Sequence, residues 1–145
     1  VIFEDEEGEM TDIFADQMPF DLDAEIVDIP PEDYGIWFVD AMDHPDRYVG
    51  KTLRFKARAR RPRGMGSKFF IPGRTAMTCC ADDTSFLGYI CKSAYAPKLK
   101  PGEWVEVTAK VAFEIRSEYQ GEGIVLYAEN VTPCEPLADE MVYFN

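Results

Sequence analysis

The chain has 145 residues, which suits a single domain able to bury an ordinary hydrophobic core without disulfide staples. Hydrophobic residues make up 46% of it and aromatic residues 13%, a composition typical of a folded globule and not of a disordered chain. The 27 acidic residues against 15 basic ones give a formal net charge of −12, which repels phosphate backbones and argues against nucleic acid as a partner.

Residues 1–30 are predicted to form an acidic linker or a loosely attached arm. The stretches FEDEEGEMTD and DLDAEIVDIP are rich in carboxylates and lack a regular hydrophobic period. Within them, residues 25–29 (EIVDI) could add a short edge strand. Residues 31–145 would then form the folded domain.

One amphipathic helix is predicted after Pro30 and Pro31, because proline is tolerated in the first turn of a helix. Within EDYGIWFVDAMDHP the apolar side chains recur at the i, i+3, i+4, i+7 and i+8 spacing of one helical face. They are Tyr34, Trp37, Phe38, Ala41 and Met42. Pro45 ends the pattern, and we expect the apolar stripe to cap a core.

Five strands are predicted after the helix. In TLRFKARAR apolar residues alternate with basic ones, the period of a half-buried strand. The others are KFFIPGRTAMTCC, bent around Pro72 and Gly73, then FLGYICK, EWVEVTAKVAFEI and GIVLYAENV. In the fourth, Val105, Val107, Ala109, Val111 and Phe113 should face inward. The pattern predicts a mainly β fold, a five-stranded OB-like Greek-key barrel with an N-terminal helix; a small sandwich is the alternative.

A basic surface is predicted on the first of these strands and in the loop after it. Its members are Arg54, Lys56, Arg58, Arg60, Arg61, Arg63 and Lys68. One interpretation is an anion-binding or partner-binding surface, in the region that OB folds use for ligands. The favoured alternative is cross-strand pairing with Glu106 and Glu114 and a solvated face. With aromatic residues absent from this face, the sequence does not support a nucleic-acid stacking platform.

The stretch RTAMTCCADD places Cys79 and Cys80 side by side, followed by Asp82 and Asp83. Neighbouring side chains on a strand point to opposite faces, so one thiol would join the core while the other faced outward. We favour this packing role, with the acids starting a turn and no cofactor bound. Redox chemistry stays open, and so does zinc held by Cys79, Cys80 and Asp83, since thiolates and carboxylates both bind this ion.

Catalytic constellations are not evident in the sequence. The only imidazole, His44, lies in the turn that ends the helix, which leaves every serine and cysteine without a plausible histidine partner. The string RGMGSK lacks the spacing and context of a phosphate-binding loop. We therefore expect a binding domain and not an enzyme.

Four motifs, YVGKTLRFKARA, GRTAMTCCADD, GEWVEVTAKV and PLADEMVYF, resemble in this order the C-terminal domain of the YcgQ-type bacterial family. The resemblance covers roughly residues 31–145. Its most specific part is the string that holds Arg74, Thr78, Cys79, Cys80 and Asp83, or Asp82 if the register shifts by one. These are the family-derived candidate binding residues.

The family resemblance implies a soluble OB-like domain that follows hydrophobic N-terminal helices in a permease subunit. It also implies a multi-spanning membrane permease as protein partner and an extracytoplasmic, membrane-tethered position for the full-length protein. No apolar run here reaches the roughly 18 residues of a membrane helix, so we expect no direct membrane insertion of this segment and further sequence upstream of Val1.

Two functions stay open from the sequence. The first is a non-catalytic OB-like accessory domain of a membrane-tethered permease subunit that binds a protein partner. The second is a metal-ion or small-ligand binding module that uses the region of Cys79, Cys80, Asp82 and Asp83.

Overall fold

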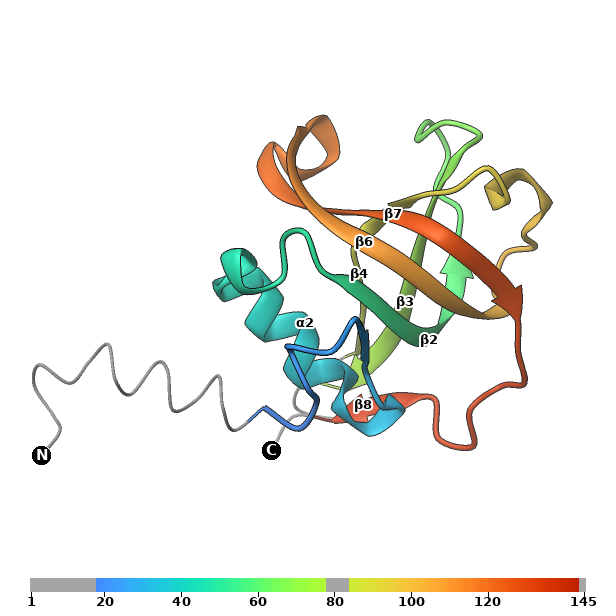
Figure 1. Ribbon diagram of the computed structural model, residues 1–145. Helices are drawn as coiled ribbons and strands as arrows, with labels where there is room; N and C mark the ends of the chain where they lie inside the picture. The colour runs from blue at the N-terminus through green and yellow to red at the C-terminus, as the bar shows by residue number, and fades with distance from the viewer. Residues whose placement is uncertain (1–17, 78–83, 144–145) are drawn as a thin grey trace, which may run out of the picture.

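The computed structural model describes residues 18–77 and 84–143, and it shows a β-barrel with one α-helix packed against it (Figure 1). The strands are β1 (Ile26–Asp28), β2 (Thr52–Arg60), β3 (Phe69–Met77), β4 (Thr84–Gly88), β5 (Ile90–Lys92), β6 (Trp104–Arg116), β7 (Gly121–Pro133) and β8 (Met141–Tyr143). The helical elements are the 3-10 turns η1 (Pro31–Asp33), η2 (Pro45–Arg47), η3 (Ala96–Lys98) and η4 (Ser117–Tyr119), and the α-helix α2 (Tyr34–Asp43).

The sheet closes on itself as a five-stranded barrel, which confirms the predicted OB-like fold and excludes the sandwich alternative. Antiparallel pairing joins β2 to β6 and β6 to β7, and a parallel pairing joins β7 to β5. β3 pairs back with β2, which closes the barrel. β4 and β5 both pair with β3, and together they correspond to the single strand predicted at FLGYICK. Closure removes most of the sheet edges that would otherwise invite aggregation.

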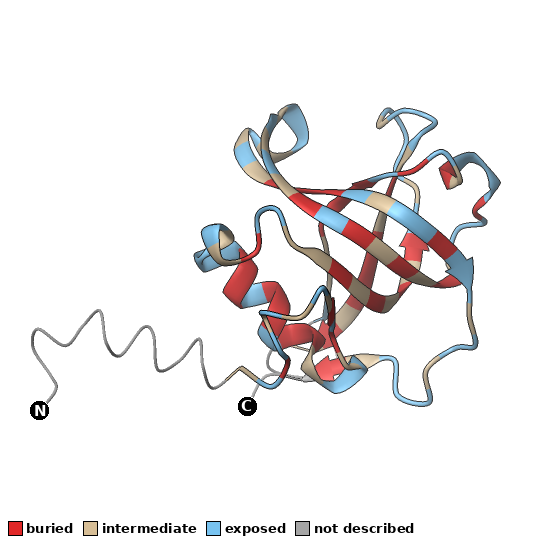
Figure 2. Ribbon diagram, in the orientation of Figure 1, coloured by how far each residue is buried: buried red, intermediate tan, exposed pale blue. Residues whose placement is uncertain are grey.

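Along the strands, buried residues alternate with less buried ones (Figure 2). Because successive side chains point to opposite faces of the sheet, the buried set forms the core inside the barrel. Val105, Val107, Ala109 and Val111 of β6 are buried, as the sequence predicts. Phe113 is not: its side chain is 40% exposed. The reason is length, because β6 and β7 continue as a hairpin beyond the last residue of β6 that pairs with β2.

The predicted helix is confirmed as α2, which covers one end of the barrel (Figure 1). The indole of Trp37 is 1% exposed and packs among three rings, with centroid distances of 5.1 Å to Tyr34, 5.1 Å to Phe55 and 5.5 Å to Tyr89. Met42 was expected in the same stripe, but it is 58% exposed. It lies on the last turn of α2, where the helix faces a surface groove instead of the barrel core.

The packed body begins before residue 31. The predicted edge strand is present as β1, which pairs in parallel with the start of β2. Phe20, Val27 and Ile29 are buried in the core, so residues 20–29, which the sequence assigned to the arm, are part of the folded body. Residues 1–17 of the predicted arm lie outside the described residues.

The C-terminal segment returns to the barrel as β8, a strand that the sequence did not predict. It pairs in parallel with the last three residues of β3, from Thr75 to Met77. This pairing brings the motif PLADEMVYF beside the motif GRTAM, although some 60 residues separate them in the chain.

Candidate functional site

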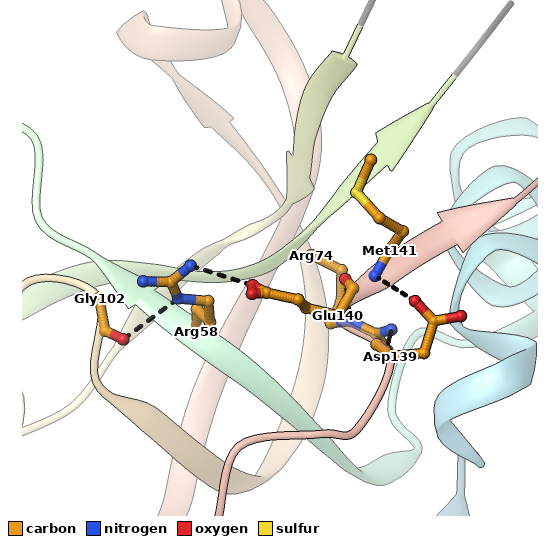
Figure 3. A network of polar contacts seen from close by, with 6 residues as sticks. All are labelled: Arg58, Arg74, Gly102, Asp139, Glu140 and Met141. Atoms are coloured by element: carbon orange, nitrogen blue, oxygen red, sulfur yellow. Dashed lines mark hydrogen bonds and ion pairs between the residues drawn. The ribbon is translucent and has the colours of Figure 1, made fainter. Parts of the chain in front are cut away.

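Arg74, the first of the candidate binding residues, is on β3 and is only 2% exposed. Its guanidinium donates to three backbone carbonyl oxygens: Nη1 to Pro31 at 3.0 Å, Nη2 to Asp139 at 3.3 Å and Nε to Glu140 at 3.4 Å. Figure 3 shows Arg74 beside Asp139 and Glu140. Burial lowers the pKa of this guanidinium, and electrostatic interactions with Tyr34, Asp139 and Glu140 oppose that shift. Arg74 thus fastens η1 and the segment before β8 to the barrel.

A hollow of about 490 Å³ lies beside Arg74, between η1 and the C-terminal segment. Glu32, Leu137 and Met141 are among the residues that line it. The hydrogen bonds of Arg74 already engage all three of its guanidinium nitrogens. The arrangement therefore favours a structural role for Arg74 over direct contact with a ligand.

The remaining candidate residues of the motif, Thr78, Cys79, Cys80, Asp82 and Asp83, lie outside the described residues. The proposed zinc site of Cys79, Cys80 and Asp83 therefore stays a prediction. Within residues 18–77 and 84–143, no group of three His, Cys, Asp or Glu residues could hold a metal ion.

The two cysteines that the structure describes should differ in reactivity. Cys91 is buried and Cys134 is half-buried, and burial raises the pKa of both thiols. Because the thiolate is the nucleophile, we expect Cys91 of the native protein to resist iodoacetamide at pH 7 while Cys134 reacts slowly. A mass-spectrometric time course on the Cys79→Ser/Cys80→Ser variant would measure this, and rapid modification of Cys91 would contradict its buried position.

On the strand part of the basic surface, the contacts differ from residue to residue. Arg54 forms a two-point ion pair with Asp28, at 2.6 and 2.9 Å. Lys56 lies opposite Glu106 in the register, as predicted. The predicted pairing with Glu114 is wrong, because β6 extends there beyond Thr52, the first residue of β2, and Glu114 accepts hydrogen bonds from the Tyr127 hydroxyl instead.

Aromatic rings reach this surface from neighbouring strands, contrary to the prediction that the face has none. Arg58 lies 5.9 Å from the ring centroid of Trp104, and Arg60 lies 3.9 Å from that of Phe86. The sequence alone could not show this, because both rings belong to other strands. In the following loop Arg61 donates to the carbonyl of Ser67 at 3.3 Å, while Arg63 and Lys68 are exposed.

A second hollow, of about 280 Å³, is an apolar groove between the end of α2 and the β6–β7 hairpin. It is lined by Ala41, Met42, Pro45, Tyr89, Phe113, Tyr119, Glu122, Gly123 and Ile124. Two of the large apolar side chains, Met42 and Phe113, are exposed there, and Ile115 beyond Phe113 on the same strand is 77% exposed. Within the described part of the chain, the groove is thus apolar surface that the fold leaves exposed.

One wall of the groove is fixed by Tyr119. Its hydroxyl donates to the carbonyl of Ile124 at 2.7 Å and accepts from the N–H of Ile90 at 2.8 Å. Gly123 lies directly under the ring, where any Cβ would clash with it. The hairpin and β5 therefore hold this ring in place, which makes the groove a preformed feature.

The apolar surface continues from the groove along α2. Ile36 and Val39 are exposed and precede Met42 at helical intervals of three residues, which places all three on the outer face. Sequence periodicity missed this face because it recognises the larger buried stripe, and the groove also requires the distant hairpin. None of the helices in the described part of the chain has the length and apolar character needed to cross a bilayer.

Comparison with known proteins gives one family and weak similarity to solved structures. The family model described as the DUF1980 C-terminal domain matches residues 6–144. Among solved structures the chain is similar to an aspartyl-tRNA synthetase from Entamoeba histolytica, at 14% identity and a TM-score of 0.39, with 72% of this chain and 22% of that chain covered. A protein described as an aspartyl-tRNA synthetase from Leishmania major Friedlin gives 16% identity and a TM-score of 0.38, with 70% of this chain and 21% of that chain covered.

The chain thus spans about a fifth of the length of these two structures, and likenesses this weak carry no argument about function. Among curated proteins no relative matches the chain.

Proposed function

The chain belongs to the family of DUF1980 C-terminal domains, and on that premise we propose that it is a non-catalytic accessory domain that binds a protein partner at the apolar groove. The observation that carries this proposal is the exposure of Met42, Phe113 and Ile115 around a preformed groove. Exposed apolar surface that is gathered in one place on a folded domain is a recognised mark of an interaction site. Methionine and aromatic residues are also enriched at protein interfaces.

Charge favours a different protein over a second copy of this chain as the partner. Each copy has a formal charge of −12, so two copies repel one another. Glu122 lines the groove, and Asp43 and Asp46 follow its lining residues Met42 and Pro45 in the chain; all three carboxylates are exposed. An apolar segment flanked by basic residues would complement both the groove and its rim.

We identify this partner with a multi-spanning membrane permease, on the strength of the resemblance to the YcgQ-type family. In that proposal the domain is part of a membrane-tethered permease subunit, in an extracytoplasmic position, and acts by holding the permease. The tether would be supplied by sequence outside this segment.

The groove proposal predicts that a charge placed in the groove weakens binding. We expect Met42→Glu and Phe113→Glu each to raise the Kd for the purified permease at least tenfold, about 1.4 kcal/mol, because each buries a carboxylate against apolar surface. Biolayer interferometry with the permease in detergent would measure this.

The matched control is Val49→Glu, which makes the same kind of change at an exposed apolar residue that does not line the groove. It should change the Kd less than twofold. The groove is not the binding site if all three variants bind as the wild type does, or if Val49→Glu is as damaging as the other two.

A further inference from the structure

A third hollow lies on the basic surface and is independent of the apolar groove. Its volume is about 250 Å³. It is lined by Arg58, Ala59 and Arg60 of β2, Thr75 of β3, Phe86 of β4, and Pro101 and Gly102 before β6. Two guanidinium groups therefore border one small cavity in a protein that is otherwise strongly acidic.

Both arginines are held in place by neighbouring groups. The Arg58 Nε donates to the carbonyl of Gly102 at 3.2 Å (Figure 3). The guanidinium of Arg60 lies 3.9 Å from the ring centroid of Phe86, a stacking distance. A guanidinium held in this way loses less conformational freedom when it binds a ligand.

Gly102 keeps the cavity open on the Arg58 side. Its φ of +83° is a backbone conformation that favours glycine. A Cβ at this position would lie 3.0 Å from Nη2 of Arg58 and would press on the guanidinium. The space between this turn and Arg58 therefore depends on the absence of a side chain.

Little negative charge neutralises the two arginines. The only ion pair of Arg58 in the described part of the chain is with Glu140, at 3.5 Å and with both side chains largely exposed, so it is weak. Within residues 18–77 and 84–143, Arg60 has neither an ion pair nor a hydrogen-bond acceptor for its side chain. Among the residues that the structure describes, the cavity thus combines fixed donors with positive charge that only the weak pair with Glu140 offsets.

The spacing of the arginines selects the shape of the anion. Residues 58 and 60 point to the same face of β2, with their Cα atoms roughly 6.6 Å apart. One guanidinium satisfies both oxygens of a carboxylate, whereas a terminal phosphate offers three oxygens and can accept from two guanidiniums at once. We propose that this hollow binds the terminal phosphate group of a ligand, between Arg58 and Arg60.

Such a phosphate could be part of a soluble phosphate monoester or of a phospholipid headgroup. The test measures binding to the full chain in two arms. Isothermal titration calorimetry uses glycerol 3-phosphate, and co-sedimentation uses phosphatidylcholine vesicles that contain phosphatidic acid. Binding in either arm supports the site and identifies the source, and binding in neither arm overturns it.

Variants distinguish the site from general electrostatic attraction. Arg58→Gln and Arg60→Gln should each weaken binding at least tenfold. The matched control Arg63→Gln removes the same charge from the adjacent loop, away from the cavity, and should weaken binding less than twofold. Equal losses in all three variants would overturn the proposal, as would succinate binding more tightly than glycerol 3-phosphate.

Discussion

Replacing Trp37 with alanine is expected to lower the free energy of unfolding by about 3–5 kcal/mol, the range for large buried aromatic residues. The indole is 1% exposed and closes one end of the barrel against Tyr34, Phe55 and Tyr89. Removing it would leave a cavity that the surrounding rings cannot fill, because they are held by three separate parts of the fold: α2, β2 and the link between β4 and β5. Urea denaturation followed by circular dichroism would measure the loss.

The control for this prediction is Trp37→Phe. The indole Nε1 is buried and has no hydrogen-bond partner within the residues that the structure describes. Phenylalanine therefore keeps most of the apolar contact and gives up no hydrogen bond to those residues, so it should cost less than half as much as alanine. A cost below about 1 kcal/mol for Trp37→Ala would mean that the helix does not close the barrel.

Most of the barrel could be predicted from the sequence, because its strands are half-buried. A strand with one face in the core must alternate apolar and polar residues, and TLRFKARAR on β2 does so over its whole length. Local signals of this kind also located α2, although Pro30 and Pro31 begin the 3-10 turn η1 and the α-helix itself begins at Tyr34. Each of these elements identifies its buried face within its own sequence.

Elements whose form depends on distant partners could not be predicted in this way. The strand β8 has three residues and follows the irregular segment PLADE, so it shows no period of its own. The exposure of Phe113 depends on how far β6 extends beyond β2, which only the strand register reveals. A sequence pattern gives the alternation of a strand but not the point at which its neighbour stops.

The candidate sites show the same division. The basic residues of β2 were evident from the sequence, but the rings of Phe86 and Trp104 that hold Arg60 and Arg58 come from other strands. The apolar groove was missed because it combines the end of α2 with a hairpin some 70 residues later. Arg74 was recognised by family resemblance, whereas its burial follows from η1 and the C-terminal segment closing over it.

Arg74→Met is expected to lower the free energy of unfolding by about 2–4 kcal/mol. It leaves the carbonyls of Pro31, Asp139 and Glu140 without their donor, and a buried acceptor left unsatisfied costs about 1–3 kcal/mol. Part of this loss is offset, because the variant no longer buries a cation whose pKa is lowered by desolvation. Methionine keeps much of the aliphatic volume, so the effect reports on the guanidinium.

The part of the fold that Arg74→Met loosens is a sharper test of this structural role than the loss in the free energy of unfolding. If Arg74 fastens the C-terminal segment, amide hydrogen exchange in Arg74→Met should accelerate first in β8, which pairs only with β3, while β6 and β7 stay protected. The control Arg54→Met removes an exposed arginine and its pair with Asp28, so it should cost less than about 1 kcal/mol and leave β8 unchanged. Equal exchange rates in β8 of the two variants would show that Arg74 does not hold this segment. The hollow beside Arg74 would then again be a candidate ligand site.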